Sequence, residues 1–81
     1  MAKPSPNHSG DPMLVAIGLA IRVARKNKGL SQESLALATE LDRSYVGGIE
    51  RGEHNLGLIS LKKVSDELGL DLSALLKMAG H

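Results

Sequence analysis

The chain has 81 residues, a formal net charge of +1 and no cysteine. These properties allow one small domain and exclude disulfide bonds, thiolate metal sites and cysteine nucleophiles. Tyr45 is the single aromatic residue among Phe, Trp and Tyr, so the core must be aliphatic. A domain of this size buries only about 60% of the surface that its unfolded chain exposes. We therefore expect burial between subunits to add to its stability.

Two function classes find no support in the residue patterns. The histidines His8, His54 and His81 lie far apart and show no metal-ligand spacing, so we expect no metal and no other cofactor. Ser31 and Ser34 have no histidine nearby, and the chain has neither a carboxylate pair nor a Gly-rich phosphate loop. We therefore do not expect an enzyme.

The apolar run over residues 13–24 is interrupted by Gly18 and Arg22 and is too short to span a bilayer. No signal-peptide pattern precedes it, so we expect a cytoplasmic protein without a membrane partner. The net charge is only weak support for nucleic-acid binding. The basic residues are grouped, however, and this grouping favours nucleic-acid binding more than the net charge does. Ordinary solvated charge is the alternative interpretation. The grouped residues are Arg22, Arg25, Lys26 and Lys28, followed by Arg43 and Arg51.

Residues 1–11 are rich in Pro, Ser and Gly and predict a flexible N-terminal tail. Asp11 as N-cap and Pro12 at the first helical position predict a helix that starts at residue 12 and ends at Gly29. Its apolar residues extend beyond one face, so the helix is either deeply buried or presents a second apolar face to a partner. These residues are Leu14, Val15, Ile17, Leu19, Ile21, Val23 and Ala24.

A second and a third helix follow, joined by a tight turn. Ser31 is a good N-cap for the second helix. The turn is predicted at Glu40, Leu41 and Asp42, where Leu41 can fill the core and Asp42 can cap the third helix. We expect the third helix to end near Gly52.

Two more helices complete the predicted bundle. Apolar residues at helical spacing predict a fourth helix that Gly69 ends, and Asp71 predicts the N-cap of a short fifth helix. No strand pattern or internal repeat is present, so residues 12–81 predict an all-α, compact bundle of five short helices. The apolar residues of the last two helices are Leu58, Leu61, Val64 and Leu68, then Leu72, Leu75, Leu76 and Met78.

An ordered set of motifs covers about three-quarters of the chain, from Ile17 to Leu76. The longest are Gly-Leu-Ser-Gln-Glu-Ser-Leu-Ala over residues 29–36 and Tyr-Val-Gly-Gly-Ile-Glu-Arg-Gly over residues 45–52. Together they resemble the XRE-type, phage-repressor-like class of bacterial helix-turn-helix regulators, which includes small controller proteins of restriction-modification systems. The resemblance implies a sequence-specific, DNA-binding transcriptional regulator whose third helix enters the major groove.

The resemblance implies base contacts by Asp42, Arg43, Ser44, Gly47 and Gly48. Arg43 is the strongest candidate, because its guanidinium matches the two acceptors of guanine, whereas a solvated helix-end charge is the alternative. Asp42 either caps the helix or also accepts a hydrogen bond from cytosine. The two glycines either let the helix approach DNA closely or mark positions that merely tolerate small residues.

The resemblance also implies DNA phosphate contacts by Ser31, Gln32, Tyr45, Arg51 and Asn55. The start of the second helix offers free backbone N–H groups, and Gln32 can add its side-chain amide at the same phosphate. For Tyr45, packing beside the turn is the alternative. Phosphate contacts would fix the register of the protein on DNA without reading its sequence.

Three further positions carry expectations. The resemblance implies a structural ion pair between Arg25 and Glu50, which would fix the orientation of the third helix. Glu40 occupies a turn position that is commonly glycine in this class, so we expect backbone strain or a variant turn there. His54 is expected to be a solvent-exposed loop histidine.

The expected partners are double-stranded DNA and a second copy of the chain. A homodimer would place two recognition helices about one DNA turn apart on a pseudo-palindromic operator, and autoregulation follows from the resemblance alone. The alternative is an antitoxin-like module that neutralises a partner protein, with the first helix as its apolar surface. The expected dimer interface consists of Leu70, Leu72, Leu75, Leu76 and Met78.

Overall fold

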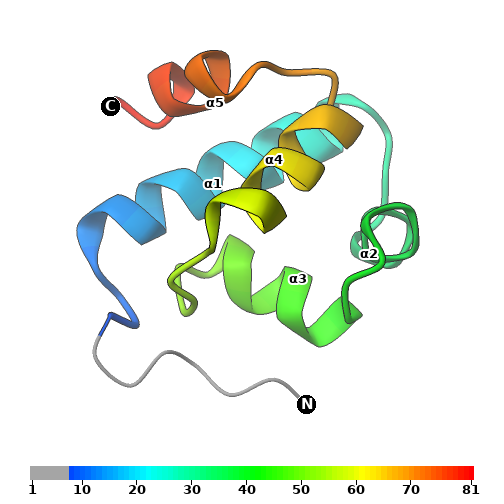
Figure 1. Cartoon of the computed structure of the whole chain (residues 1–81), viewed down its shortest axis with the longest axis horizontal. Coiled ribbons are helices and arrows are strands. Elements are labelled where there is room, and N and C mark those ends of the chain that lie inside the picture. Colours follow the sequence, from blue (N-terminus) through cyan, green and yellow to red (C-terminus); the bar gives the residue numbers. More distant parts are fainter. Residues whose placement is uncertain (1–7) are drawn as a thin grey trace.

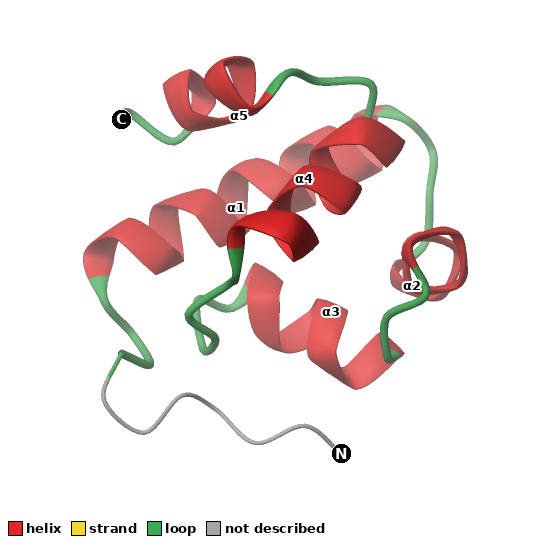
Figure 2. Ribbon diagram, in the orientation of Figure 1, coloured by secondary structure: helices red, strands yellow, loops and turns green. Residues whose placement is uncertain are grey.

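The structure is a computed structural model that describes residues 8–81 of the chain. Its helices are α1 (Pro12–Asn27), α2 (Gln32–Thr39), α3 (Arg43–Glu50), α4 (Leu58–Glu67) and α5 (Leu72–Met78). Loops and turns connect them, and no strand occurs in this part of the chain (Figure 2). The prediction of a compact all-α bundle of five short helices is confirmed.

Local capping begins the first two helices as predicted. The carboxylate of Asp11 accepts a hydrogen bond from the N–H of Met13 at 2.9 Å, and Pro12 is the first residue of α1. The hydroxyl of Ser31 accepts one from the N–H of Ser34 at 3.0 Å at the start of α2. Each cap satisfies a backbone donor that has no partner within its helix.

The later helix ends follow the predictions less closely. Gly29 and Gly69 adopt left-handed φ angles of 74° and 72° just after α1 and α4, as expected for residues that stop helices. Asp71 occupies the N-cap position of α5, but its side chain makes no capping hydrogen bond. The predicted N-cap position is therefore confirmed, but without the stabilising bond from the carboxylate.

The helix α1 runs through the middle of the fold, with α3 packed on one side and α5 on the other (Figure 1). The helix α2 contacts α3 and α4, and α4 also contacts α5. Gly18 permits the close approach of α1 and α3, because a Cβ at this position would overlap the carbonyl oxygen of Ile49 and lie 2.8 Å from that of Glu50. The backbone of α3 is therefore seated directly on α1.

The core is aliphatic, and every helix contributes an aliphatic side chain that is less than 2% exposed. Leu75 of α5 is one of them, so its predicted place at a dimer interface is wrong. Spacing alone cannot distinguish the inner from the outer apolar residues of so short a helix. Leu70, Leu72 and Leu76 are half-buried against the core, and Met78 is 46% exposed. The aliphatic side chains below 2% exposed are Ile21, Leu35, Val46, Val64 and Leu75.

The outer face of α1 carries exposed apolar side chains. Val15, Leu19 and Val23 are between 43% and 58% exposed. Of the two alternatives for this helix, the structure therefore supports the second apolar face. None of the helices among the described residues has the length and apolarity needed to cross a lipid bilayer.

The predicted tail, residues 1–11, lies outside the described residues as far as residue 7. Its last residues form a turn, in which the N–H of Asp11 donates to the carbonyl of His8 at 2.9 Å. The N–H of Gly10 donates to the carbonyl of Gly52, also at 2.9 Å. The start of α1 is thereby tied to the loop that follows α3.

Candidate nucleic-acid interface

The helices α2 and α3 are joined by a tight turn that contains one left-handed residue. Glu40 adopts φ 59° and ψ 33°, which is strained for a residue with a Cβ and agrees with the strain expected there. The N–H of Leu41 then donates to the carbonyl of Ala36 at 2.9 Å, which closes the turn. The carboxylate of Asp42 caps α3 by accepting from the N–H of Ser44 at 3.1 Å, as predicted.

A buried ion pair fixes the unit formed by α2, the turn and α3 to α1. Arg25 Nε donates to Glu50 Oε2 at 2.6 Å, and Nη2 donates to Oε1 at 3.1 Å. The two side chains are 9% and 2% exposed. Arg25 Nη1 also donates to the carbonyl of Leu30 at 2.7 Å, and Gln32 Nε2 donates to Glu50 Oε1 at 3.1 Å. The predicted pair is present, and it connects the end of α1 with the end of α3 and the start of α2.

The starts of α2 and α3 meet through side chains. Arg43 Nη1 donates to Gln32 Oε1 at 3.0 Å. A Cβ at Gly47 would lie 3.1 Å from Arg51 Nη1 and 3.5 Å from Gln32 Oε1. We call Gln32, Arg43, Gly47 and Arg51 the polar face of the unit. It combines two residues expected to contact bases, Arg43 and Gly47, with two expected to bind phosphates, Gln32 and Arg51.

Arg51 on this face has an acidic partner within the protein. Its Nε lies 2.7 Å from Glu53 Oε2, and its Nη2 donates to Oε1 at 3.3 Å. This hydrogen-bonded pairing raises the pKa of Arg51 and lowers the pKa of Glu53. Arg51 is therefore paired within the protein, and its contact with a DNA phosphate stays a prediction.

Asp42 is committed to the start of α3. Hydrogen bonds from the backbone N–H and the hydroxyl of Ser44 lower the pKa of the Asp42 carboxyl, which therefore stays ionised at neutral pH. The carboxylate also faces the positive end of the α3 dipole. The structure thus supports the capping alternative for Asp42, whereas base contacts by Asp42 and Ser44 stay predictions.

His54 is buried, so the prediction of a solvent-exposed loop histidine is wrong. The residue is 7% exposed, and its ring centroid lies 4.5 Å from that of Tyr45 at an interplanar angle of 34°. A Cβ at Gly48 would overlap Nε2 of the same ring. Gly48 is therefore covered by this ring, and Tyr45 packs against it; packing was the alternative expected for Tyr45, although beside the turn rather than on His54. The sequence feature that could have revealed this packing is the mid-helix glycine Gly48, six residues before His54. A single such pair shows no periodicity, so it could not be recognised as a pattern.

The remaining expected phosphate contacts lie on exposed residues. Ser31 Oγ caps α2 and lies 2.9 Å from Ser34 Oγ. Asn55 is exposed beside the first turn of α1, where it lines small cavities together with Met13 and Leu14. Phosphate contacts by Ser31 and Asn55 stay predictions.

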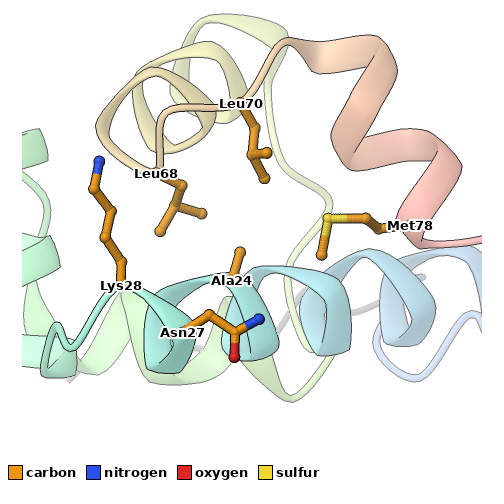
Figure 3. Close-up of a pocket in the computed structure, with 6 residues that line it drawn as sticks. All are labelled: Ala24, Asn27, Lys28, Leu68, Leu70 and Met78. Carbon is orange, nitrogen blue, oxygen red and sulfur yellow. The ribbon is translucent and has the colours of Figure 1, made fainter.

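A cavity of about 300 Å³ lies between the end of α1, the end of α4 and α5 (Figure 3). Lys28 lies at its edge and donates from Nζ to the carbonyl of Glu67 at 3.1 Å. None of its lining residues comes from α2 or α3, so this cavity is separate from the polar face. The lining residues are Ala24, Asn27, Lys28, Leu68, Leu70 and Met78.

Comparison with known proteins agrees with this geometry. Residues 21–75 match the family model described as "Helix-turn-helix". The chain is 44% identical over 62 residues to the control protein C.MunI of a Mycoplasma species, covering 75% of this chain and 84% of that protein. It is 38% identical over 61 residues to the immunity repressor protein of Bacillus phage phi105, covering 75% of this chain but only 42% of the repressor.

A solved structure is similar as well. The crystal structure of the restriction-modification controller protein C.AhdI from Aeromonas hydrophila superposes with a TM-score of 0.74 at 47% sequence identity. The match covers 76% of this chain and 94% of that protein. The resemblance to the phage-repressor class and its controller proteins is therefore confirmed. The chain belongs to the helix-turn-helix family of DNA-binding transcriptional regulators, together with restriction-modification controller proteins and phage repressors.

Proposed function

We propose that this chain regulates transcription by binding a pseudo-palindromic operator as a homodimer. In this proposal α3 lies in the major groove and Arg43 reads a guanine base. The start of α2 holds the adjacent phosphate through Gln32. The operator lies upstream of the chain's own gene, so that the protein regulates its own expression.

The polar face is the observation that carries this proposal. Arg43 and Arg51 place two guanidinium groups on one surface with the Gln32 amide between the helices. Guanidinium groups suit both the acceptors of guanine and the oxygens of phosphate. Gly47 is buried beside them, and the absence of a side chain there lets the side chains of Arg51 and Gln32 lie close to the backbone of α3.

The buried ion pair gives this surface a fixed orientation. Glu50 accepts from Arg25 of α1 and from Gln32 of α2, so a change in the tilt of α3 would break several charge-assisted hydrogen bonds. A recognition helix that is held in this way loses little freedom when it binds DNA. The arrangement therefore favours sequence-specific binding.

A continuous apolar surface supports the homodimer. Leu58 and Ile59 at the start of α4 are 76% and 77% exposed. Leu58 lines an apolar cavity of about 210 Å³ together with Met13 of α1 and Leu76 of α5. The expected interface residue Leu76 thus shares one surface with the exposed start of α4. We place the second copy of the chain on this surface, because a small aliphatic domain gains stability from burying it.

The DNA-binding experiment is a titration of a fluorescent duplex from the gene's own upstream region, followed by anisotropy at several salt concentrations. Wild type is compared with Arg43→Ala and with Lys63→Ala, an exposed lysine of α4 that removes the same charge elsewhere. We expect Arg43→Ala to lose about 1–3 kcal/mol of discrimination between the operator and a random duplex. Lys63→Ala should retain it.

The outcomes separate the parts of the proposal. Equal, weak binding of wild type to every duplex would contradict self-regulation, and a selection of sites from genomic DNA would then test sequence-specific binding itself. Equal effects of Arg43→Ala and Lys63→Ala would show that Arg43 supplies charge only. A steep decrease of affinity with salt is expected in either case, since phosphate contacts release counterions.

The dimer experiment is sedimentation equilibrium of Leu58→Glu. A carboxylate in the proposed interface should convert the dimer to a folded monomer, because Leu58 is not part of the core. Leu37→Glu is the matched control, since Leu37 of α2 is 78% exposed and lies outside this surface. If both variants remain dimers, the interface lies elsewhere.

A second candidate is the antitoxin-like module, favoured by the exposed Val15, Leu19 and Val23 of α1. A protein partner bound there would cover this stripe. Leu19→Glu should then abolish inhibition of a toxin encoded beside the gene and leave operator binding unchanged. Growth of cells that express the toxin together with each variant measures this effect.

A further inference from the structure

His54 has an unusual environment for a loop residue. It is 7% exposed, and its Nε2 atom is buried without a hydrogen-bond partner among the described residues. Leaving such an atom unpaired is unfavourable. Another interaction of the ring must therefore retain it in this position.

One side of the ring is packed against the backbone of α3. A Cβ at Gly48 would overlap Nε2 and lie 2.6 Å from Cδ2, so the ring occupies the space of a missing side chain. The N–H of Glu53 donates to the carbonyl of Gly48 at 2.9 Å, and the N–H of Gly52 donates to that of Ile49 at 3.0 Å. These two hydrogen bonds hold Gly52 and Glu53, the two residues before His54, against the end of α3.

The other contact of the ring is Tyr45, which belongs to the first half of α3. The centroids lie 4.5 Å apart, within the range of aromatic contacts. Tyr45 is half-buried and stands two residues after Arg43. The ring therefore connects the mid-helix backbone with the end of α3 that carries the proposed base-reading side chain.

We propose that His54 is a positioning residue for DNA reading. Its ring is wedged between Gly48 and Tyr45, holds Tyr45 in place and so determines which bases the first half of α3 contacts. The role rests on the proposed function. His54 does not use Nε2 for a phosphate contact, because that atom is turned into the protein.

His54→Leu is the most direct test, because leucine is of similar size, leaves no unpaired polar atom and cannot stack on Tyr45. We expect its melting temperature to be unchanged or higher. The ratio of operator affinity to random-duplex affinity should decrease by about 3- to 10-fold, as expected for the loss of one aromatic contact. Affinity for the random duplex should stay the same.

Tyr45 provides a spectroscopic readout, since the chain has one tyrosine and no tryptophan. Its emission therefore reports on the surroundings of this one side chain, which include the ring of His54. We expect His54→Leu to change this emission in the free protein. Wild type and Lys63→Ala should have the same emission.

A double-mutant cycle of Gly48 and His54 tests independently whether the ring is packed between Gly48 and Tyr45. In wild type, Gly48→Ala should lower both the melting temperature and operator discrimination, because the new Cβ displaces the ring. In a His54→Ala background the same change should raise the melting temperature, since alanine is favoured over glycine inside a helix. Gly47→Ala is the stability control, because its Cβ meets the flexible end of Arg51 at 3.1 Å and Gln32 Oε1 at an ordinary contact distance of 3.5 Å.

Three results would overturn the role of His54. One is full operator discrimination by His54→Leu. Another is an equal loss of affinity for both duplexes, which would indicate a phosphate contact. The third is a Gly48→Ala effect of the same sign in both backgrounds. If wild type itself binds operator and random duplex equally, the proposed function fails and the role of His54 fails with it. If wild type discriminates between the duplexes and the variants do so equally well, only the role of His54 is overturned.

Discussion

Replacing Glu50 by glutamine tests how the buried ion pair holds the recognition helix. The glutamine keeps the shape of the side chain but offers one acceptor oxygen where the carboxylate offers two. It also leaves the Arg25 guanidinium, whose side chain is 9% exposed, without a counter-charge. The perturbation is therefore a buried, unpaired charge rather than a cavity.

The expected loss of stability is large for so small a domain. Removing one partner of a buried pair lowers the free energy of unfolding by about 3–5 kcal/mol. A chain of 81 residues has a total stability of about 4–12 kcal/mol. Since 1 kcal/mol changes the melting temperature of such a domain by about 4–8 °C, we expect a decrease of at least about 12 °C.

Thermal unfolding followed by circular dichroism measures this decrease. Asp66→Asn is the control, because Asp66 pairs with Lys62 at 2.8 Å on the surface, where both side chains are about 60% exposed. Its expected effect is at most about 0.5 kcal/mol. The double variant Arg25→Met with Glu50→Gln should recover part of the loss, because no unpaired charge remains.

The reasoning would be refuted by a melting temperature of Glu50→Gln within about 2 °C of the Asp66→Asn value, since 0.5 kcal/mol corresponds to a shift of that order. It would also be refuted if the double variant were less stable than Glu50→Gln alone. In that case Arg25 would stabilise the domain through its bond to the carbonyl of Leu30 and not through Glu50.

Four further outcomes are expected. Glu40→Gly should raise the free energy of unfolding by about 1 kcal/mol in urea titrations, because glycine adopts the left-handed φ of 59° without strain. Leu75→Ala should lower it by about 2–5 kcal/mol in the same assay, since this side chain is fully buried. The pKa of Asp42 is lowered in the folded state, so its carboxylate stabilises the fold above the unfolded pKa. This stabilisation is lost as the pH falls through the folded pKa. The melting temperature of wild type should therefore fall more steeply below about pH 4 than that of Asp42→Asn. Glu53→Gln should strengthen binding to any duplex by up to about 5-fold in anisotropy titrations, because Arg51 no longer has an acidic partner within the protein.

Much of the helical framework could be predicted because its signals are local. Asp11, Ser31 and Asp42 each cap a helix through a bond to a backbone N–H two or three residues away. Such a bond depends on the residue type and on the nearby backbone, and both can be judged from sequence. The exception is Asp71, where the position was right but the carboxylate makes no capping bond.

The candidate site was predictable only in part. The Arg25 and Glu50 pair followed from the resemblance to known regulators, and the structure contains it. The bond between Gln32 and Arg43 was not foreseen, because it depends on how the starts of two helices are placed after the turn at Glu40. The sequence showed polar residues in both helices, but not that they meet.

The sequence by itself determined where the helices begin and end, that the core is aliphatic, and to which family the chain belongs. These features depend on neighbouring residues, on composition and on the order of motifs. Only the tertiary structure decided that Leu75 lies in the core, that His54 is buried between Gly48 and Tyr45, and that Arg43 lies beside Gln32. These contacts join residues on different helices and loops or across a turn, so they arise only when the helices pack, and no local periodicity encodes them.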